Sequence, residues 1–210
     1  MRQHRWIILG FLLPSCGSIP LTAERFGGSA HTSYSVQARD WAAADLEARF
    51  GGVIDAPEAC RRLAREGARL IHANPELPRD CQYLVLDEAS CNAFSLPGRI
   101  YVTRGLYARL ERSHHLAAAL AHEFAHLVRG DSLKPRCATD AESLDREMDA
   151  DRLAMRYLCR AGYHDTSLGE LIELVRDEQP LSWVERRGLA LGEPCDPAWT
   201  QSPRAEPAGH

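Results

Sequence analysis

Two histidines with a glutamate between them stand near the middle of the chain, in the segment His122-Glu123-Phe124-Ala125-His126. On an α-helix, residues four apart lie on the same side, about 40° around the axis and one turn along it. Both imidazoles of such a pair can therefore bind one zinc ion. Glu123 lies beside them and can take a proton from a zinc-bound water, which is the chemistry of a hydrolase.

The residues around this motif indicate a helix that positions it. The stretch 116–130 reads LAAALAHEFAHLVRG, Ser113 is suited to cap its start, and Gly130 is suited to end it. On a helical wheel, one side of the stretch is apolar, formed by Leu116, Leu120, Phe124 and Leu127. His122 and His126 lie away from the centre of that side. We therefore expect the helix to bury one face and to present the histidines to a cleft.

A catalytic zinc site takes three protein ligands and keeps one position open for water. The candidate for the third ligand is Glu147, in the acidic run Glu147-Met148-Asp149-Ala150-Asp151. A capping box at 139–142 predicts a helix that runs to about residue 160 and can turn back against the motif helix. Asp151 falls one turn beyond Glu147, where it can orient a ligating histidine. The alternative is a solvated acidic face, but the two histidines favour the ligand interpretation.

The rest of the pattern predicts an α+β fold that is mostly helical, with a small β-hairpin or sheet beside the motif helix. We expect the strand at 82–86 to pair with the strand at 99–103 as a hairpin, and residues 92–98 to form a compact turn. Further helices are expected at 37–50, 55–72, 104–111, 139–160 and 167–178.

The chain resembles the HtpX/Oma-type zinc metallopeptidases, which include the CAAX prenyl proteases and periplasmic proteases of the BepA and LoiP kind. Three stretches carry the resemblance. They are the HEFAH motif, the run Glu147–Asp151 followed by Ala161-Gly162-Tyr163, and the segment Asn92–Gly98 (NAFSLPG) with the strand after it. They occur in the family's order, and three ordered motifs are far more specific than one.

The resemblance implies a zincin-like metallopeptidase domain with one zinc ion per chain. His122, His126 and Glu147 would be the zinc ligands, and Glu123 would be the general base. Protein or peptide substrates would follow from this assignment.

The resemblance also implies that the segment with Asn92, Ala93 and Phe94 borders the cleft. An extended substrate can add there as a further strand, held by main-chain hydrogen bonds. A purely structural hairpin is the compatible alternative. Gln179 stands where many members have a histidine, and Asp131 replaces the histidine that many soluble members carry. A histidine-based role at position 179 is therefore not implied.

Other histidines and arginines give weaker signals. His114 and His115 precede the motif, but adjacent residues on a helix point in different directions, so we expect two surface histidines and no second metal site. His164, Arg186 and Arg187 are weak candidates for stabilising an oxyanion. Structural or solvated roles are the alternative for each.

The N-terminus has the layout of a secretory signal, with a basic start, a short apolar run and then Leu13-Pro14-Ser15-Cys16. This placement of Cys16 resembles a bacterial lipobox, in which the cysteine is acylated. An ordinary signal peptide or a retained anchor is the alternative. We expect a signal peptide at 1–15, a flexible tether at 16–36, the peptidase domain at 37–195 and a disordered tail at 196–210.

Net charge and cysteine count bear on two further questions, nucleic-acid binding and disulfide bonds. A formal net charge of −4 gives no electrostatic case for nucleic-acid binding. Apart from Cys16, six cysteines remain, and an even number in an exported protein allows disulfides. A Cys81–Cys91 bridge is unfavourable because the two residues bracket the strand expected at 82–86, which holds its ends too far apart for a disulfide.

Together these features predict a zinc endopeptidase of the bacterial cell envelope, located in the periplasm and anchored to the membrane through a lipid on Cys16. Misfolded or misassembled envelope proteins are the substrates that the resemblance implies. A non-catalytic, zinc-stabilised module that binds unfolded proteins or joins an assembly is the second hypothesis. A cytoplasmic protease with an uncleaved N-terminus is the third.

Overall fold

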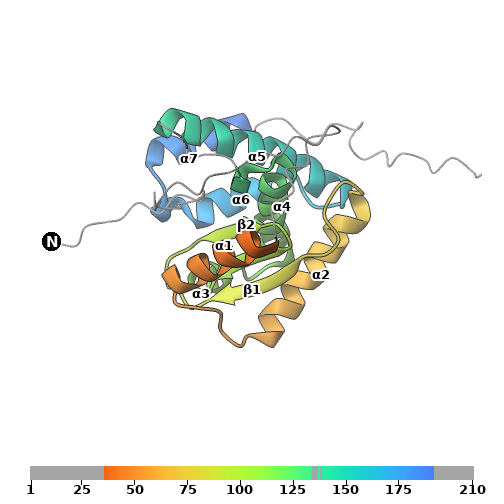
Figure 1. Cartoon of the computed structure of the whole chain (residues 1–210). Coiled ribbons are helices and arrows are strands. Elements are labelled where there is room, and N and C mark those ends of the chain that lie inside the picture. Colours follow the sequence, from red (N-terminus) through yellow and green to blue (C-terminus); the bar gives the residue numbers. More distant parts are fainter. Residues whose placement is uncertain (1–35, 134–136, 138, 192–210) are drawn as a thin grey trace, which may run out of the picture.

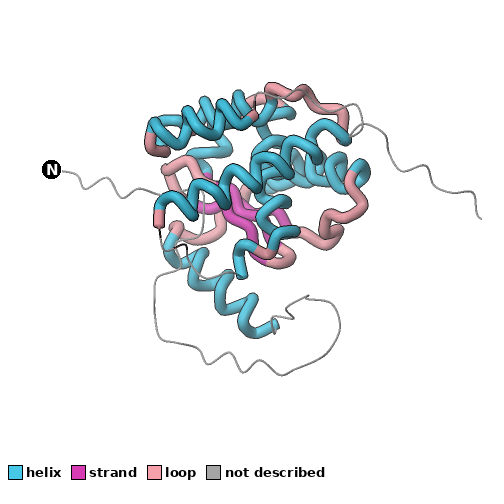
Figure 2. The backbone as a smooth tube through the Cα atoms, turned by 90° about the horizontal axis from the view of Figure 1, so that it is seen from above, coloured by secondary structure: helices cyan, strands magenta, loops and turns pink. Residues whose placement is uncertain are grey.

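The computed structural model describes residues 36–133, 137 and 139–191. The expected signal peptide, nearly all of the expected tether with Cys16, and the expected tail lie outside these residues. Helices dominate and enclose a small sheet, which confirms the mostly helical α+β fold (Figures 1 and 2). The helices are α1 (Val36–Arg49), α2 (Pro57–Ala73), α3 (Arg104–Arg109), α4 (Ser113–Arg129), α5 (Asp140–Arg160), α6 (Ser167–Leu174) and α7 (Leu181–Ala190). The strands are β1 (Gln82–Leu86), β2 (Ala93–Leu96) and β3 (Arg99–Thr103), and single 3₁₀ turns are η1 (Asp131–Leu133) and η2 (Arg176–Glu178).

The prediction of a hairpin between the first and last of these strands is wrong. β1 pairs with β3 in parallel, β2 pairs with β3 in antiparallel fashion, and the strand order is β1-β3-β2. The hairpin lies instead between β2 and β3, where Gly98 adopts a φ of 85° in the connecting turn. All four residues of β2 are buried, including the polar Ser95, and four residues are too few to establish a period-2 pattern from the sequence.

The sheet lies between two layers of helix. On one face Tyr101 and Phe94 pack with Ala43 and Leu46 of α1. On the other face Ile100, Val102 and Ala93 join the main core with residues of α2 and α4. Because neighbouring residues of a strand point to opposite faces, the short β3 supports both layers.

Helix α4 is the central element of the molecule. It contacts α2, α5, α6 and β2. Its buried alanines at 117–119, 121 and 125 carry little side-chain volume, so neighbouring elements can approach its axis closely. Within the described part of the chain, no helix is both long enough and apolar enough to cross a membrane. The helix that bears the zinc-binding motif is thus held from several sides.

Candidate metal centre

Helix α4 carries the motif as the sequence predicts, but residues 115–126 are all buried, so the expectation that one face presents the histidines to an open cleft is wrong. The start of the helix differs as well. Ser113 is its first residue, and the N-cap is Arg112, which has extended backbone angles and no capping side-chain hydrogen bond. The prediction of Ser113 as the cap is therefore wrong by one residue. The prediction for the other end is confirmed, because Gly130 ends the helix in the left-handed conformation with φ at 65°.

His122, His126 and Glu147 come together in the interior, between α4 and α5. The Nε2 atoms of the two histidines lie 3.1 Å apart, and Nε2 of His122 lies 3.1 Å from Oε2 of Glu147. Nε2 of His126 lies 3.5 Å from Oε1 of Glu147. All three side chains are buried. Three potential ligand atoms therefore face a single point.

This spacing fits a zinc ion. Tetrahedral zinc with bonds of about 2.0–2.1 Å holds its ligand atoms roughly 3.3 Å apart. The distances of 3.1 to 3.5 Å among the three side chains bracket that value. Two imidazole nitrogens and one carboxylate form a donor set typical of catalytic zinc, with a fourth position left for water or substrate.

Two further carboxylates hold the histidine rings through their other nitrogens. Nδ1 of His122 lies 2.9 Å from Oδ1 of Asp151, and Nδ1 of His126 lies 3.0 Å from Oδ2 of Asp131. Such contacts fix the ring orientation and leave Nε2 free for a metal. The sequence predicted this position for Asp151. It gave no role to Asp131, which the left-handed turn at Gly130 brings back beside His126.

Arg187 joins this network from α7. Its guanidinium is buried and binds Asp151 through two nitrogens, at 2.7 and 2.8 Å, while a third nitrogen donates to Oε1 of Gln179 at 2.9 Å. It also lies 3.9 Å from Oε2 of Glu147. The other two weak candidates for an oxyanion role, His164 and Arg186, are exposed. Arg187 thus holds Asp151, which in turn holds a histidine of the metal centre.

The electrostatics of the centre favour a cation. Burial lowers the pKa of His126, but Glu147 and Asp131 outweigh burial and raise that pKa to about 10. Burial raises the pKa of Glu147, yet His126 and His122 hold it well below its ordinary value. The carboxylates therefore impose a negative potential at both rings, which is the environment that a divalent metal ion requires.

Glu123 lies next to the metal centre in a nearly dry environment. Its side chain is buried, and burial raises its pKa against the opposing influence of His126 and His122. With His122 it lines a cavity of about 10 Å³, which is room for about one water molecule. Leu171 and Ile172 of α6 also line this cavity. A proton acceptor and a water-sized space thus adjoin the three potential ligands.

The three residues expected at the substrate strand have different surroundings. Ala93 lines the cavity beside His122 and Glu123. Phe94 points to the opposite face of the sheet, where its ring packs on Phe50 with the ring centroids 4.4 Å apart. Asn92 is buried, and its Oδ1 accepts a hydrogen bond from the main chain of Ala93. The structure therefore brings Ala93 to the site and directs Phe94 away from it.

The interpretation of His114 and His115 as two divergent surface residues is wrong. His115 is buried, and the Nε2 atoms of both rings lie near one carboxylate oxygen of Glu170. The helical offset separates their Cβ atoms, but the rings turn toward the same side because α6 places Glu170 over both. That contact depends on the packing of α6 against α4, which cannot be predicted from the spacing of residues along one helix.

Most of the cysteines that the structure describes are free thiols. Cys60, Cys81, Cys91 and Cys137 are unbridged, and Cys159 is disulfide-bonded. The prediction against a Cys81–Cys91 bridge is confirmed. None of the described cysteines belongs to a group that could hold a metal ion.

Comparison with known families agrees with this geometry. Residues 57–144 match the sequence profile of peptidase family M48. No curated protein matches the chain. The match covers the sheet and the HEFAH helix and ends just before Glu147, so the position of Glu147 rests on the structure. The buried His122–His126–Glu147 group agrees with the zinc that this family binds, and the chain therefore contains a domain of peptidase family M48, a zinc metallopeptidase that hydrolyses peptide bonds.

Proposed function

We propose that the chain is a zinc endopeptidase in which His122, His126 and Glu147 hold one zinc ion and Glu123 is the general base. Zinc bound there would lower the pKa of a coordinated water and polarise the substrate carbonyl. Glu123 takes the proton from the attacking water and passes it to the leaving amine. Asp151 and Asp131 keep the two imidazoles in the orientation that the metal requires.

The observation that carries this proposal is the convergence of the three ligand atoms within 3.5 Å, next to a buried carboxylate and a water-sized cavity. The second hypothesis, a non-catalytic module, accounts for the three ligands but gives no role to Glu123. Glu123 is buried, and burying a carboxylate costs free energy. A general base next to the zinc ion explains why the carboxylate of Glu123 is buried there. Structural stabilisation by zinc alone does not explain it.

Strand β2 is the best candidate for binding the substrate. It lies at one edge of the described sheet, packs on α4 and places Ala93 beside the metal centre. An extended peptide can pair with such an edge through main-chain hydrogen bonds. The cavity beside Glu123 is too small for a peptide, so part of its lining must move when a substrate enters.

The cellular setting that we propose is the bacterial envelope. The basic and apolar start of the chain and the position of Cys16 support export and a lipid anchor on the periplasmic side. Misfolded or misassembled envelope proteins are the proposed substrates, by the resemblance to HtpX/Oma-type proteases. Metabolic labelling with palmitate is expected to mark the wild type and to fail in Cys16→Ala, and equal labelling of both would remove the anchor.

Removal of the metal tests the enzymatic proposal directly. We expect the protein to degrade fluorescent casein, to lose this activity after 1,10-phenanthroline and dialysis, and to regain it with about one equivalent of Zn²⁺. Measured release of fluorescence, beside metal analysis of the same samples, checks this. Full activity in metal-free protein would contradict the mechanism. Tight zinc binding without hydrolysis would favour the non-catalytic module.

A further inference from the structure

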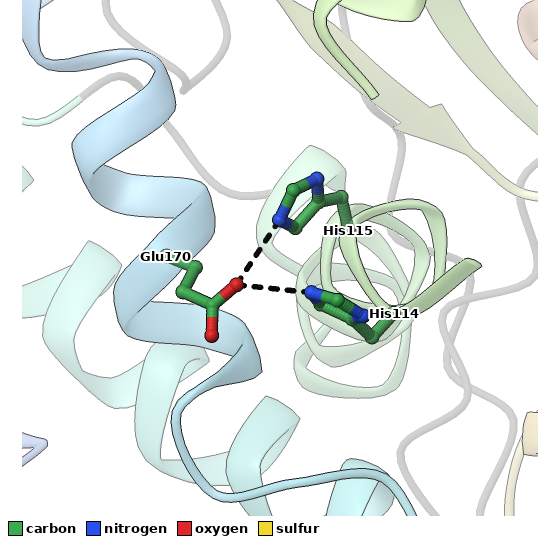
Figure 3. A group of neighbouring side chains, drawn as sticks. All are labelled: His114, His115 and Glu170. Carbon is green, nitrogen blue, oxygen red and sulfur yellow. Dashed lines mark hydrogen bonds and ion pairs between the residues drawn. The ribbon is translucent and has the colours of Figure 1, made fainter. Parts of the chain in front are cut away.

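A second group of histidines and a carboxylate lies where α4 begins and faces α6. Figure 3 shows the rings of His114 and His115 on α4 directed toward the carboxylate of Glu170 on α6. Nε2 of His114 lies 2.9 Å from Oε2 of Glu170, and Nε2 of His115 lies 3.2 Å from the same oxygen. Three potential ligand atoms thus lie within 4.8 Å of one another.

The carboxylate of Glu170 is already oriented for this arrangement. Oγ1 of Thr166, one turn earlier in the chain, donates a hydrogen bond to Oε1 of Glu170 at 2.9 Å. The second oxygen, Oε2, is therefore the one turned to the two histidines. A carboxylate held through one oxygen and offering the other is the usual arrangement around protein metal ligands.

The group is open to solvent, unlike the buried centre at His122. His115 and Glu170 line a groove of about 1100 Å³, to which Asp165, Glu173 and Arg112 also contribute. The side chains of His114 and Glu170 remain 30% and 42% exposed. A hydrated ion can reach the group through this groove, and water can complete its coordination.

We propose that His114, His115 and Glu170 bind a second transition-metal ion such as Zn²⁺, and that the ion fastens α6 to α4. Two imidazole nitrogens and one carboxylate oxygen suit zinc and its neighbours in the periodic table. Calcium and magnesium prefer all-oxygen sites. Along α4 the group lies two turns before His122, about 10 Å away. It shares no residue with the first centre, and zinc binding to it can be measured without any peptidase activity.

A metal ion at this second site also affects helix α6, which lines the catalytic cavity. Leu171 and Ile172 of α6 line the cavity over His122 and Glu123, and they follow Glu170 directly in the chain. An ion that joins Glu170 to two residues of α4 adds a bond across this contact. Because it binds only the folded arrangement, the second ion raises the thermal midpoint of unfolding.

Counting bound zinc in defined variants tests the second site. After equilibrium dialysis of the full chain against Zn²⁺, we expect about two ions per wild-type chain and about one per chain of Glu170→Gln, whose amide is a poor ligand. His114→Gln, altered at a partly exposed position, is expected to bind about one as well. Glu173→Gln is the matched control, because it changes another carboxylate of α6 that lines the same groove, and it is expected to keep both ions.

Two results would overturn the second site. One is a wild type that binds a single zinc ion, which leaves the group as a hydrogen-bonded cluster of two histidines and a carboxylate. The other is a second ion that persists in both Glu170→Gln and His114→Gln, since it would then reside elsewhere in the chain. The thermal midpoint gives an independent readout, because added Zn²⁺ is expected to raise it further in Glu173→Gln than in Glu170→Gln.

Discussion

The Glu123→Gln variant is expected to lose about 10²- to 10⁴-fold in kcat/KM for peptide hydrolysis, the range that a positioned general base contributes. Glutamine has the size and shape of glutamate, so the cavity and the neighbouring histidines keep their packing. Its amide cannot take a proton from water at neutral pH. The loss is therefore expected in the chemical step, with little change in KM.

Binding of zinc and folding are expected to survive the same change. Glu123 is not one of the three converging ligands, and burial already disfavours its charge, as its raised pKa shows. An uncharged side chain of the same shape removes that penalty, so the free energy of unfolding should stay equal or rise. Metal analysis and urea unfolding of the same preparations separate lost chemistry from lost structure.

The matched control is Glu58→Gln, the same chemical change at a side chain that is 73% exposed on α2. It should retain the activity of the wild type. Equal kcat/KM in Glu123→Gln and Glu58→Gln would remove the general-base role. A loss of zinc in Glu123→Gln would instead show that this carboxylate supports the metal.

Local sequence patterns were sufficient for the residues that share one helix or one turn. The spacing of His122 and His126, the left-handed end at Gly130 and the Thr139 cap before α5 are all short-range features, and each is found in the structure. Placing Glu147 opposite the histidines required one further assumption, that α5 folds back on α4. The small residues of α4 make that packing close.

Features that depend on contacts between distant segments could not be predicted in this way. The parallel pairing of β1 with β3 depends on β2 occupying the antiparallel position beside β3. Arg187 resembled its exposed neighbour Arg186 in sequence, and only the packing of α7 against α5 shows which one is buried. An arginine at a helical position four after an apolar Trp183 is a weak signal for burial, since long charged side chains often lie beside apolar ones.

The buried arginine links stability to the metal centre. Burial raises the pKa of Asp151, but Arg187 and His122 hold it below its ordinary value, so the carboxylate stays charged in the interior. That charge orients His122 through Nδ1. Arg187 therefore compensates a buried negative charge that the metal centre requires. It belongs to α7, which lies after the residues that match family M48.

The Arg187→Met variant is accordingly expected to lower the free energy of unfolding by about 3–5 kcal/mol, because it leaves a buried carboxylate without its ion-pair partner. Zinc affinity is expected to fall by about 10- to 100-fold, since Asp151 is no longer fixed against His122. Arg186→Met is the matched control, the same change at the adjacent exposed position, and is expected to stay within about 0.5 kcal/mol of the wild type. Urea unfolding and zinc competition titrations measure the two effects.

Adding Asp151→Asn to Arg187→Met separates the loss of stability from the loss of zinc affinity. The double variant no longer buries an unpaired charge, so part of the lost stability should return. Its zinc affinity should stay low, because an amide is a weaker partner for Nδ1 of His122 than a carboxylate. If stability and zinc affinity recovered together, or if Arg187→Met unfolded like Arg186→Met, the Arg187–Asp151 pair would not be the link between α7 and the metal centre.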